Sequence, residues 1–213
     1  MSKKGILSIL LTITVISFLV LCFLVVQHPI PSFDHKISIF VQKYHSDPLD
    51  KIMLGISFFG ELPYSLVMVV LVAFIFYRFK YKRESYFILS IMLSGLLILG
   101  VKNLIDRPRP TAFYVRLVEI NRFQSFPSGH VMSYVLFFGF IIILMRELKG
   151  ISLFTKRLIT YSSAFFILTI AFSRIYLGAH WFSDTVGGFL LGVISLFLLC
   201  YFYFNKAVKK NRG

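Results

Sequence analysis

Two histidines and one aspartate are the residues of this sequence best suited to nucleophilic or acid–base chemistry. His180 and Asp184 lie four positions apart, so a helix would place them on one face. A carboxylate in that position accepts a hydrogen bond from one imidazole nitrogen, which leaves the other nitrogen free to attack an electrophile. His130 opens a separate apolar segment, where it could donate a proton to a bound group.

Cations and a helix N-terminus accompany these three residues at the ends of apolar segments. Lys102 lies near the end of one segment, and the prolines beyond it favour an extended, projecting turn at Arg109. Ser128 suits a helix N-cap, and Gly129 lets a ligand approach the free N–H groups of that helix start, which favour phosphate. Arg174 offers a planar pair of donors for two phosphate oxygens. These residues predict a phosphate-binding site.

Together these groups suit phosphoryl transfer without a metal ion. Charge on the phosphate oxygens is stabilised by fixed cations and N–H groups, while one histidine attacks and the other protonates the leaving oxygen. The remaining histidines, His28, His35 and His45, have no partners at metal-ligand spacing. The cysteines Cys22 and Cys200 lie inside apolar runs and indicate no disulfide or thiolate site. We therefore expect no metal and no other cofactor.

The elements that position these residues are expected to be membrane-spanning helices. The chain has 213 residues, is 57% hydrophobic and has a mean hydropathy of +0.80. Its 15% charged residues compare with roughly 25% in soluble domains, and a soluble fold of this size could not hide so much apolar surface. We expect one all-α integral-membrane domain over residues 1–213. Six apolar runs are candidate transmembrane helices: about 6–26, 64–78, 86–105, 129–145, 158–177 and 185–204.

The distribution of basic residues predicts how these helices are oriented. With the N-terminus in the cytoplasm, lysines and arginines gather on four short segments of that side, as they do in multi-pass membrane proteins. This topology also accounts for the net charge of +14, so we expect no nucleic-acid partner. Both termini are then cytoplasmic, and the polar blocks at 102–110, 125–130 and 173–184 face the extracytoplasmic side. The basic residues are Lys3, Lys4, Arg78, Lys80, Lys82, Arg83, Arg146, Lys149, Lys156, Arg157, Lys206, Lys209, Lys210 and Arg212.

Two segments on this map have particular interpretations. The first apolar run is longer than a signal-peptide core of about 7–15 residues and precedes no small-x-small cleavage site, which predicts an uncleaved anchor in the cell membrane. Residues 32–61 show apolar positions at helical spacing, interrupted by charges and by Pro48. We expect one or two amphipathic interfacial helices there, serving either as a packed lid or as a gate for substrate.

Three ordered motifs in this sequence resemble the signature of the type 2 phosphatidic acid phosphatase (PAP2) superfamily. The motifs are Lys-x6-Arg-Pro, then Pro-Ser-Gly-His, then Ser-Arg-x5-His-x3-Asp, and no signature position departs from the pattern. The matching residues are Lys102, Arg109 and Pro110; Pro127, Ser128, Gly129 and His130; and Ser173, Arg174, His180 and Asp184.

The resemblance implies a metal-independent, membrane-integrated hydrolase that acts on a lipid phosphate or diphosphate. It implies that His180 is the nucleophile that forms a phosphohistidine, oriented by Asp184, and that His130 is the general acid. It also implies substrates of the phosphatidate, phosphatidylglycerol phosphate or undecaprenyl diphosphate class. The residues implied to hold the phosphate are Lys102, Arg109, Ser128, Gly129 and Arg174.

Two other functions use the same residues or the same fold. A lipid phosphotransferase would pass the phosphoryl group to an acceptor other than water. A polytopic lipid-binding or transport protein would retain the site without catalysis, although it would then have little reason to keep both histidines and the aspartate. Beyond lipid phosphate and membrane lipids the sequence indicates no partner, and it leaves the oligomeric state open. Arg107, Arg116 and Arg122 are additional candidates for contacting a second phosphate or a headgroup.

Overall fold

The computed structural model describes residues 3–121 and 123–210, and neither range contains a β-strand. The α-helices are α1 (Lys3–Gln27), α2 (Ser32–Gln42), α3 (Asp47–Ser57), α4 (Tyr64–Arg78), α5 (Lys82–Ser90), α6 (Ser94–Ile105), α7 (Gly129–Glu147), α8 (Leu153–Tyr176) and α9 (Phe182–Lys210). Short 3-10 helices, η1 (Phe58–Gly60) and η2 (Ile91–Leu93), join α3 to α4 and α5 to α6. Arg122 and Arg212, and the side chains of Lys3, Lys4, Lys206, Lys209 and Lys210, lie outside the described part of the chain.

The helices confirm the prediction of an all-α membrane protein. In the described ranges, five stretches are long and apolar enough to cross a membrane: Gly5–Gln27, Lys82–Ile105, Gly129–Glu147, Leu153–Tyr176 and Phe182–Asn205. A sixth arises if Asp47–Gly60 and Tyr64–Arg78 form one span, which is bent by 60°. With 15 residues, α4 is shorter than the roughly 20 needed to cross the hydrocarbon, so the second predicted span differs from the others.

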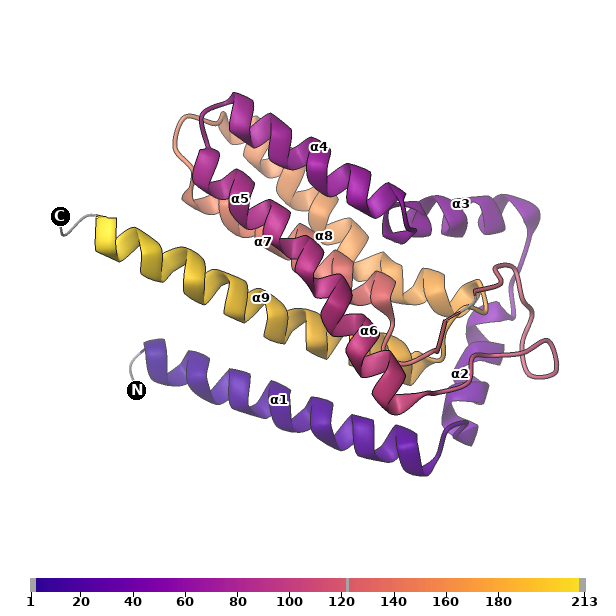
Figure 1. The fold of residues 1–213 in the computed structure, drawn as a ribbon. Coiled ribbons are helices and arrows are strands. Elements are labelled where there is room, and N and C mark those ends of the chain that lie inside the picture. The colour runs from indigo at the N-terminus through magenta and orange to yellow at the C-terminus, as the bar shows by residue number, and fades with distance from the viewer. Residues whose placement is uncertain (1–2, 122, 211–213) are drawn as a thin grey trace.

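Helix α7 forms the centre of the bundle and packs between α8 and α9 (Figure 1). It is two-thirds buried, whereas most apolar side chains of α1 are exposed on the outside of the bundle. Close packing of α9 on α7 depends on glycines. A Cβ at Gly192 would lie 2.8 Å from the Cβ of Val135, and one at Gly188 would lie 2.5 Å from the carbonyl oxygen of Ser128. The GxxxG pattern of α9 therefore packs within the bundle.

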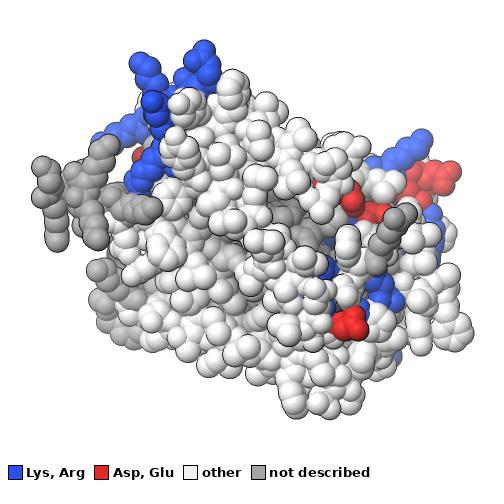
Figure 2. Space-filling view, in the orientation of Figure 1, with Lys and Arg blue, Asp and Glu red and all other residues white. Residues whose placement is uncertain are grey.

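The two chain termini lie at one end of the bundle, and α2 and α3 lie at the opposite end (Figure 1). Figure 2 shows lysines and arginines gathered near the end that holds the termini, whereas basic and acidic residues are mixed at the other end. Helix α2 has an unusual polarity, because Asp34, Ser38 and Gln42 are buried while Ile39 and Phe40 are exposed. Its polar face thus points into the protein and its apolar face points outward, as suits a helix at a lipid interface.

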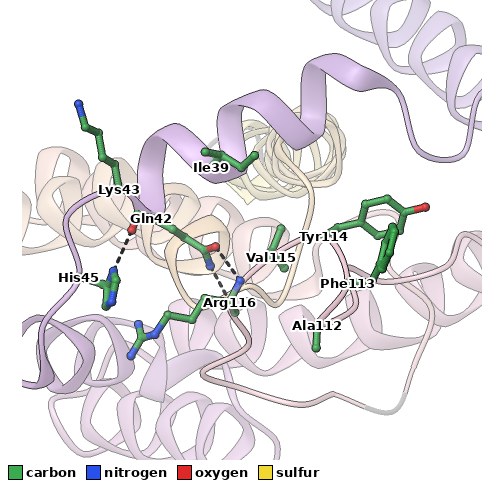
Figure 3. A pocket seen from close by; sticks show the side chains of 9 residues that line it. All are labelled: Ile39, Gln42, Lys43, His45, Ala112, Phe113, Tyr114, Val115 and Arg116. Atoms are coloured by element: carbon green, nitrogen blue, oxygen red, sulfur yellow. Dashed lines mark hydrogen bonds between the residues drawn. The ribbon is translucent and has the colours of Figure 1, made fainter.

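A hollow of 480 Å³ separates α2 from the loop that precedes α7 (Figure 3). Gln42 connects α2 to this loop across the hollow. Its Oε1 accepts from the N–H of Arg116 at 3.0 Å, and its Nε2 donates to the carbonyl of Arg116 at 2.7 Å. The same amide group donates to the carbonyl of Tyr176 at 2.8 Å. Gln42 therefore ties α2 to the loop and to the end of α8, at the level where the polar residues of the sequence motifs gather.

Candidate active site

The turn between α8 and α9 carries His180 and directs it toward Asp184. Gly178 makes this turn possible, since its φ is 70° and a Cβ there would lie 2.3 Å from the carbonyl oxygen of Arg116. His180 is 1% exposed and Asp184 is fully buried in the first turn of α9. The His180 Nδ1 lies 3.4 Å from the Asp184 Oδ2, and the other ring nitrogen, Nε2, lies 3.5 Å from Nη1 of Arg109. The ring is thus oriented with Nε2 toward a cation.

Asp184 is held by three groups besides His180. Nη1 of Arg107 donates to Oδ1 at 2.5 Å. The backbone N–H of Trp181 donates to Oδ2 at 2.8 Å, and the hydroxyl of Ser125 donates to the same oxygen. Since both oxygens are engaged, the carboxylate has one orientation, and this orientation fixes the tautomer of His180 with the proton on Nδ1.

Two of the predicted phosphate-binding cations also hold the loop before α7 against the site. Arg109 donates to the carbonyl of Ala179 at 2.6 Å and to the carbonyl of Phe123. Lys102, near the end of α6, donates to the carbonyl of Gln124. Burial lowers the pKa of Arg109 to about 10, so its guanidinium is still charged at neutral pH. A hollow of 560 Å³ opens beside Arg109 and these loop residues.

The start of α7 is fixed to the start of α9, which brings the second motif to the third. The Ser128 hydroxyl caps α7 by accepting from the N–H of Val131 at 3.5 Å, and the Ser128 N–H donates to the carbonyl of Asp184 at 2.9 Å. The space beside Gly129 would admit a Cβ, whose nearest neighbour would be Ile98 at 3.6 Å. Close packing therefore does not require glycine at this position.

His130 lies in the first turn of α7 against the loop between α3 and α4. A Cβ on Gly60 would lie 2.3 Å from the His130 ring, so the absence of a side chain there makes room for the imidazole. The His130 Nε2 is 3.0 Å from Oε1 of Glu61, but the two buried atoms do not have hydrogen-bond geometry. This nitrogen therefore has no hydrogen-bond partner among the described residues.

Arg174 is fully buried near the end of α8 and is held by a carboxylate that sequence reasoning missed. Its Nη1 and Nη2 donate to Glu119 at 2.7 and 2.6 Å, and Nη1 also donates to the hydroxyl of Ser57 at 3.0 Å. Glu119 accepts a further bond from Asn121. A phosphate that binds Arg174 through the same two nitrogens has to displace this carboxylate.

Comparison with known proteins decides the family to which this arrangement belongs. A family model described as the PAP2 superfamily matches residues 83–207, which is more than half of the chain. The chain belongs to the PAP2 superfamily. Phosphatidylglycerophosphatase B of Bacillus subtilis (strain 168) is 29% identical over 199 residues, which cover 92% of this chain and 94% of the relative.

Two solved structures share the fold. The transmembrane PAP2 type phosphatidylglycerolphosphate phosphatase from Bacillus subtilis superposes with a TM-score of 0.81 at 24% identity, covering 92% of this chain and 96% of that one. LpxE of Aquifex aeolicus gives a TM-score of 0.57 at 25% identity, with 78% and 93% covered. The protein is therefore a membrane lipid phosphatase of the PAP2 superfamily, as the three motifs predicted.

The PAP2 motif residues surround His180 with positive charge. Burial, followed by the charges of Arg109, Arg174 and Lys102, lowers the pKa of His180 well below its usual value. The ring is therefore neutral at neutral pH, and a neutral imidazole is the form that can act as a nucleophile.

Two arginines expected to contact a second phosphate or a headgroup are paired with carboxylates in the structure. Arg107 is buried, and its guanidinium is fully used by Pro29, Asp34, Ser183 and Asp184. Arg116 forms a two-bond ion pair with Asp50 in α3, and this bonding raises the pKa of Arg116. Asp34 and Asp50 come from the 32–61 segment and could not be paired with these arginines from sequence. Contact of either arginine with a second phosphate or a headgroup stays a prediction. Arg122 is not among the described residues.

The sequence predicted no metal site, and the described residues contain no cluster of potential metal ligands. No group of three or more histidine, cysteine, aspartate or glutamate side chains in these ranges could hold a metal ion. The carboxylates nearest the site are instead paired with arginines, as Asp184 is with Arg107 and Glu119 is with Arg174. Independence from metals remains a prediction for assay.

Proposed function

We propose that this membrane lipid phosphatase hydrolyses a lipid phosphate or diphosphate through a phosphohistidine at His180, on the extracytoplasmic face. One observation carries the proposal, namely that Asp184 holds one nitrogen of the buried ring while the other faces Arg109. A neutral imidazole fixed in this way, beside a group that binds phosphate oxygens, is arranged for attack on phosphorus.

In the first step, Nε2 of His180 attacks the phosphorus atom and the bond from phosphorus to the lipid oxygen breaks. His130 gives a proton to that oxygen, so the lipid leaves as an alcohol or, from a diphosphate, as a monophosphate. The ring of His180 becomes positively charged, and the Asp184 carboxylate stabilises it.

In the second step, water replaces the lipid at the phosphorus atom. The neutral His130 left by the first step accepts a proton from this water, whose oxygen attacks phosphorus as the bond to His180 Nε2 breaks. Inorganic phosphate leaves and both histidines return to their starting states. Lys102, Arg109 and Arg174 stabilise the charge of the equatorial oxygens in both steps, together with the Ser128–Gly129 start of α7.

The substrate class we favour first is phosphatidylglycerol phosphate. The curated relative that covers nearly the whole chain has the name phosphatidylglycerophosphatase B. The hollow of 560 Å³ beside Arg109 is within the usual range of roughly 300–1,000 Å³ for small-molecule pockets, which gives room for a glycerol headgroup. Phosphatidate and undecaprenyl diphosphate remain substrates to be compared.

The proposed orientation follows from charge. The connection from α4 to α5, which carries Arg78, Lys80 and Lys82, lies at the end of the bundle that holds the chain termini, and the starts of α7 and α9, near the motif residues, lie toward the other end (Figure 1). Since lysine and arginine accumulate on cytoplasmic loops, the termini are placed in the cytoplasm and the site outside. A reporter fused after Gly213 should be cytoplasmic, and an external reporter would contradict this orientation.

The test of the activity is phosphate release by the protein purified in detergent, with EDTA present, from phosphatidylglycerol phosphate, phosphatidate and undecaprenyl diphosphate. The proposal predicts release that is lost in His180→Ala and is fastest with one lipid. Activity that EDTA abolishes and added metal restores would argue against the metal-free mechanism. Analysis of the products for a phosphorylated acceptor separates hydrolysis from phosphotransfer.

A further inference from the structure

Three buried charges from distant parts of the chain form a row that ends at the His180–Asp184 pair. Nη2 of Arg107 lies 2.7 Å from Oδ2 of Asp34, and its Nη1 lies 2.5 Å from Oδ1 of Asp184. All three side chains are completely inaccessible to solvent. Asp34 comes from α2, a helix of the 32–61 segment whose role the sequence left open.

The row is rigid because its other hydrogen bonds are also made. Asp34 accepts from the backbone N–H of Ser183 at 2.9 Å and from the Ser183 hydroxyl at 2.5 Å. Arg107 donates to that hydroxyl at 2.8 Å and to the carbonyl of Pro29 at 2.8 Å. Fixed charges with satisfied hydrogen bonds in a poorly solvated place interact more strongly than charges at a surface.

The sign of the charges shows what Asp34 contributes. Arg107 alone would neutralise Asp184, and the row would offer no net charge to the ring of His180. With Asp34 present, Asp34 and Arg107 cancel and the negative charge of Asp184 remains. This charge matters because the ring gains a positive charge when it bonds to phosphorus.

The remaining charged groups near His180 are mostly positive, and they make a positive charge on its ring harder to form. Two carboxylates nearby face other partners. Glu119 is paired with Arg174, and Glu61 lies beside His130. The groups that disfavour a charged ring are Arg109 from the loop after α6, Arg174 from α8, Lys102 from α6 and His130 from α7. Among these surroundings Asp184 is the one carboxylate that contacts His180 in the described ranges.

We propose that Asp34 and Arg107 are positioning residues that hold Asp184 in place and keep its negative charge available to His180. This inference rests on the proposed function, in which His180 is the nucleophile. It gives α2 a part in the reaction, since α2 delivers the outermost carboxylate of the row.

The first test is Asp34→Asn, measured as kcat, KM and the pH at which activity falls on the acid side. Asparagine can still accept the Ser183 N–H bond but cannot balance Arg107. We expect kcat to fall by roughly ten- to a hundredfold, by analogy with the loss when groups that orient metal-bound histidines are removed, with KM unchanged. We also expect the acid limb to move to lower pH, because a charged ring is less stabilised.

The decisive variant is Asp34→Asn combined with Arg107→Gln, which restores a single net negative charge. We expect its kcat and acid limb to move back toward the wild-type values, whereas Arg107→Gln alone should move the limb to higher pH. If Asp34 and Arg107 had a purely structural role, the double variant would have a lower kcat than either single variant, and the acid limb of the pH profile would stay in place in all three. The Arg107 variants decide the question even if Asp34→Asn is too unstable to purify.

Asp50→Asn provides the matched control. Asp50 pairs with Arg116 and so also joins the 32–61 segment to the loop before α7, but it does not contact Asp184. Its acid limb should stay at the wild-type pH. Release of phosphate that does not depend on His180 overturns the proposed function together with this inference. Release that depends on His180, with an unmoved limb in the Asp34 and Arg107 variants, overturns this inference alone.

Discussion

Replacing Asp184 with asparagine removes the charge beside His180 and keeps the size of the side chain. The amide can still accept one of the bonds from Arg107 or Trp181, but it cannot balance a positive imidazole ring. Leaving a buried charge without its partner costs a fold about 3–5 kcal/mol, and we take the same cost for the positive His180 ring, which forms only as the reaction proceeds. Each factor of ten in rate corresponds to about 1.36 kcal/mol of barrier, so kcat should fall by roughly two to four orders of magnitude. The 3.4 Å separation of Nδ1 and Oδ2 exceeds an ideal hydrogen bond and favours the lower half of that range.

The assay is steady-state phosphate release in detergent, with kcat and KM measured separately. KM should change little, because the oxygens of Asp184 contact Arg107, Ser125, Trp181 and His180 and none of the cations proposed to bind phosphate. Asp50→Asn, which makes the same chemical change in a pair away from the ring, should keep kcat close to wild type. A variant of Asp184 that retains more than a fifth of the wild-type kcat, or that loses activity only through KM, would refute the reasoning.

Three further predictions concern binding, pH and packing. Arg174→Lys should raise KM about tenfold, because lysine cannot give the two parallel hydrogen bonds of arginine, and an unchanged KM would exclude Arg174 from phosphate binding. Because burial and nearby cations lower the pKa of His180, the free enzyme should keep its kcat/KM as pH falls through 6.5, which a pH profile of kcat/KM checks. An acid limb centred at pH 6.5 would contradict this. Gly188→Ala should lower the unfolding temperature by several degrees, because its Cβ would meet the Ser128 backbone at 2.5 Å, and an unchanged temperature would show that α9 can shift.

The spans and the motif cluster could be predicted because both depend on local sequence. Long apolar runs are visible in the sequence as such, and each of the six runs falls on helical segments, the third on α5, η2 and α6 together. The structure brings His180 close to Asp184 and Arg109, as the family pattern suggested. The bend between α3 and α4 was not predicted. The sequence of neither helix alone shows whether that helix spans the membrane or lies along its surface.

The carboxylates of the site could not be predicted in the same way. Glu119 and Glu61 lie in loops with no periodicity, and nothing in the sequence connects them with Arg174 or His130. Asp34 resembles an ordinary first-turn residue of an amphipathic helix, although it pairs with Arg107 far along the chain. Such pairs depend on how the loops fold over the helix ends. One sequence signal did point to these pairs. Asp34, Ser38 and Gln42 recur at helical spacing along α2, and the structure buries this polar face instead of exposing it.

The central claim is that His180 carries the phosphoryl group, and trapping the phosphorylated enzyme tests it most directly. The purified protein would be mixed with its preferred lipid phosphate, quenched in alkali within milliseconds to seconds, and digested for mass spectrometry. We expect a phosphate on His180 that is stable to base, is lost in acid and is absent from His180→Ala. Rapid release of phosphate with no phosphorylated enzyme, or with the phosphate on another residue, would contradict it.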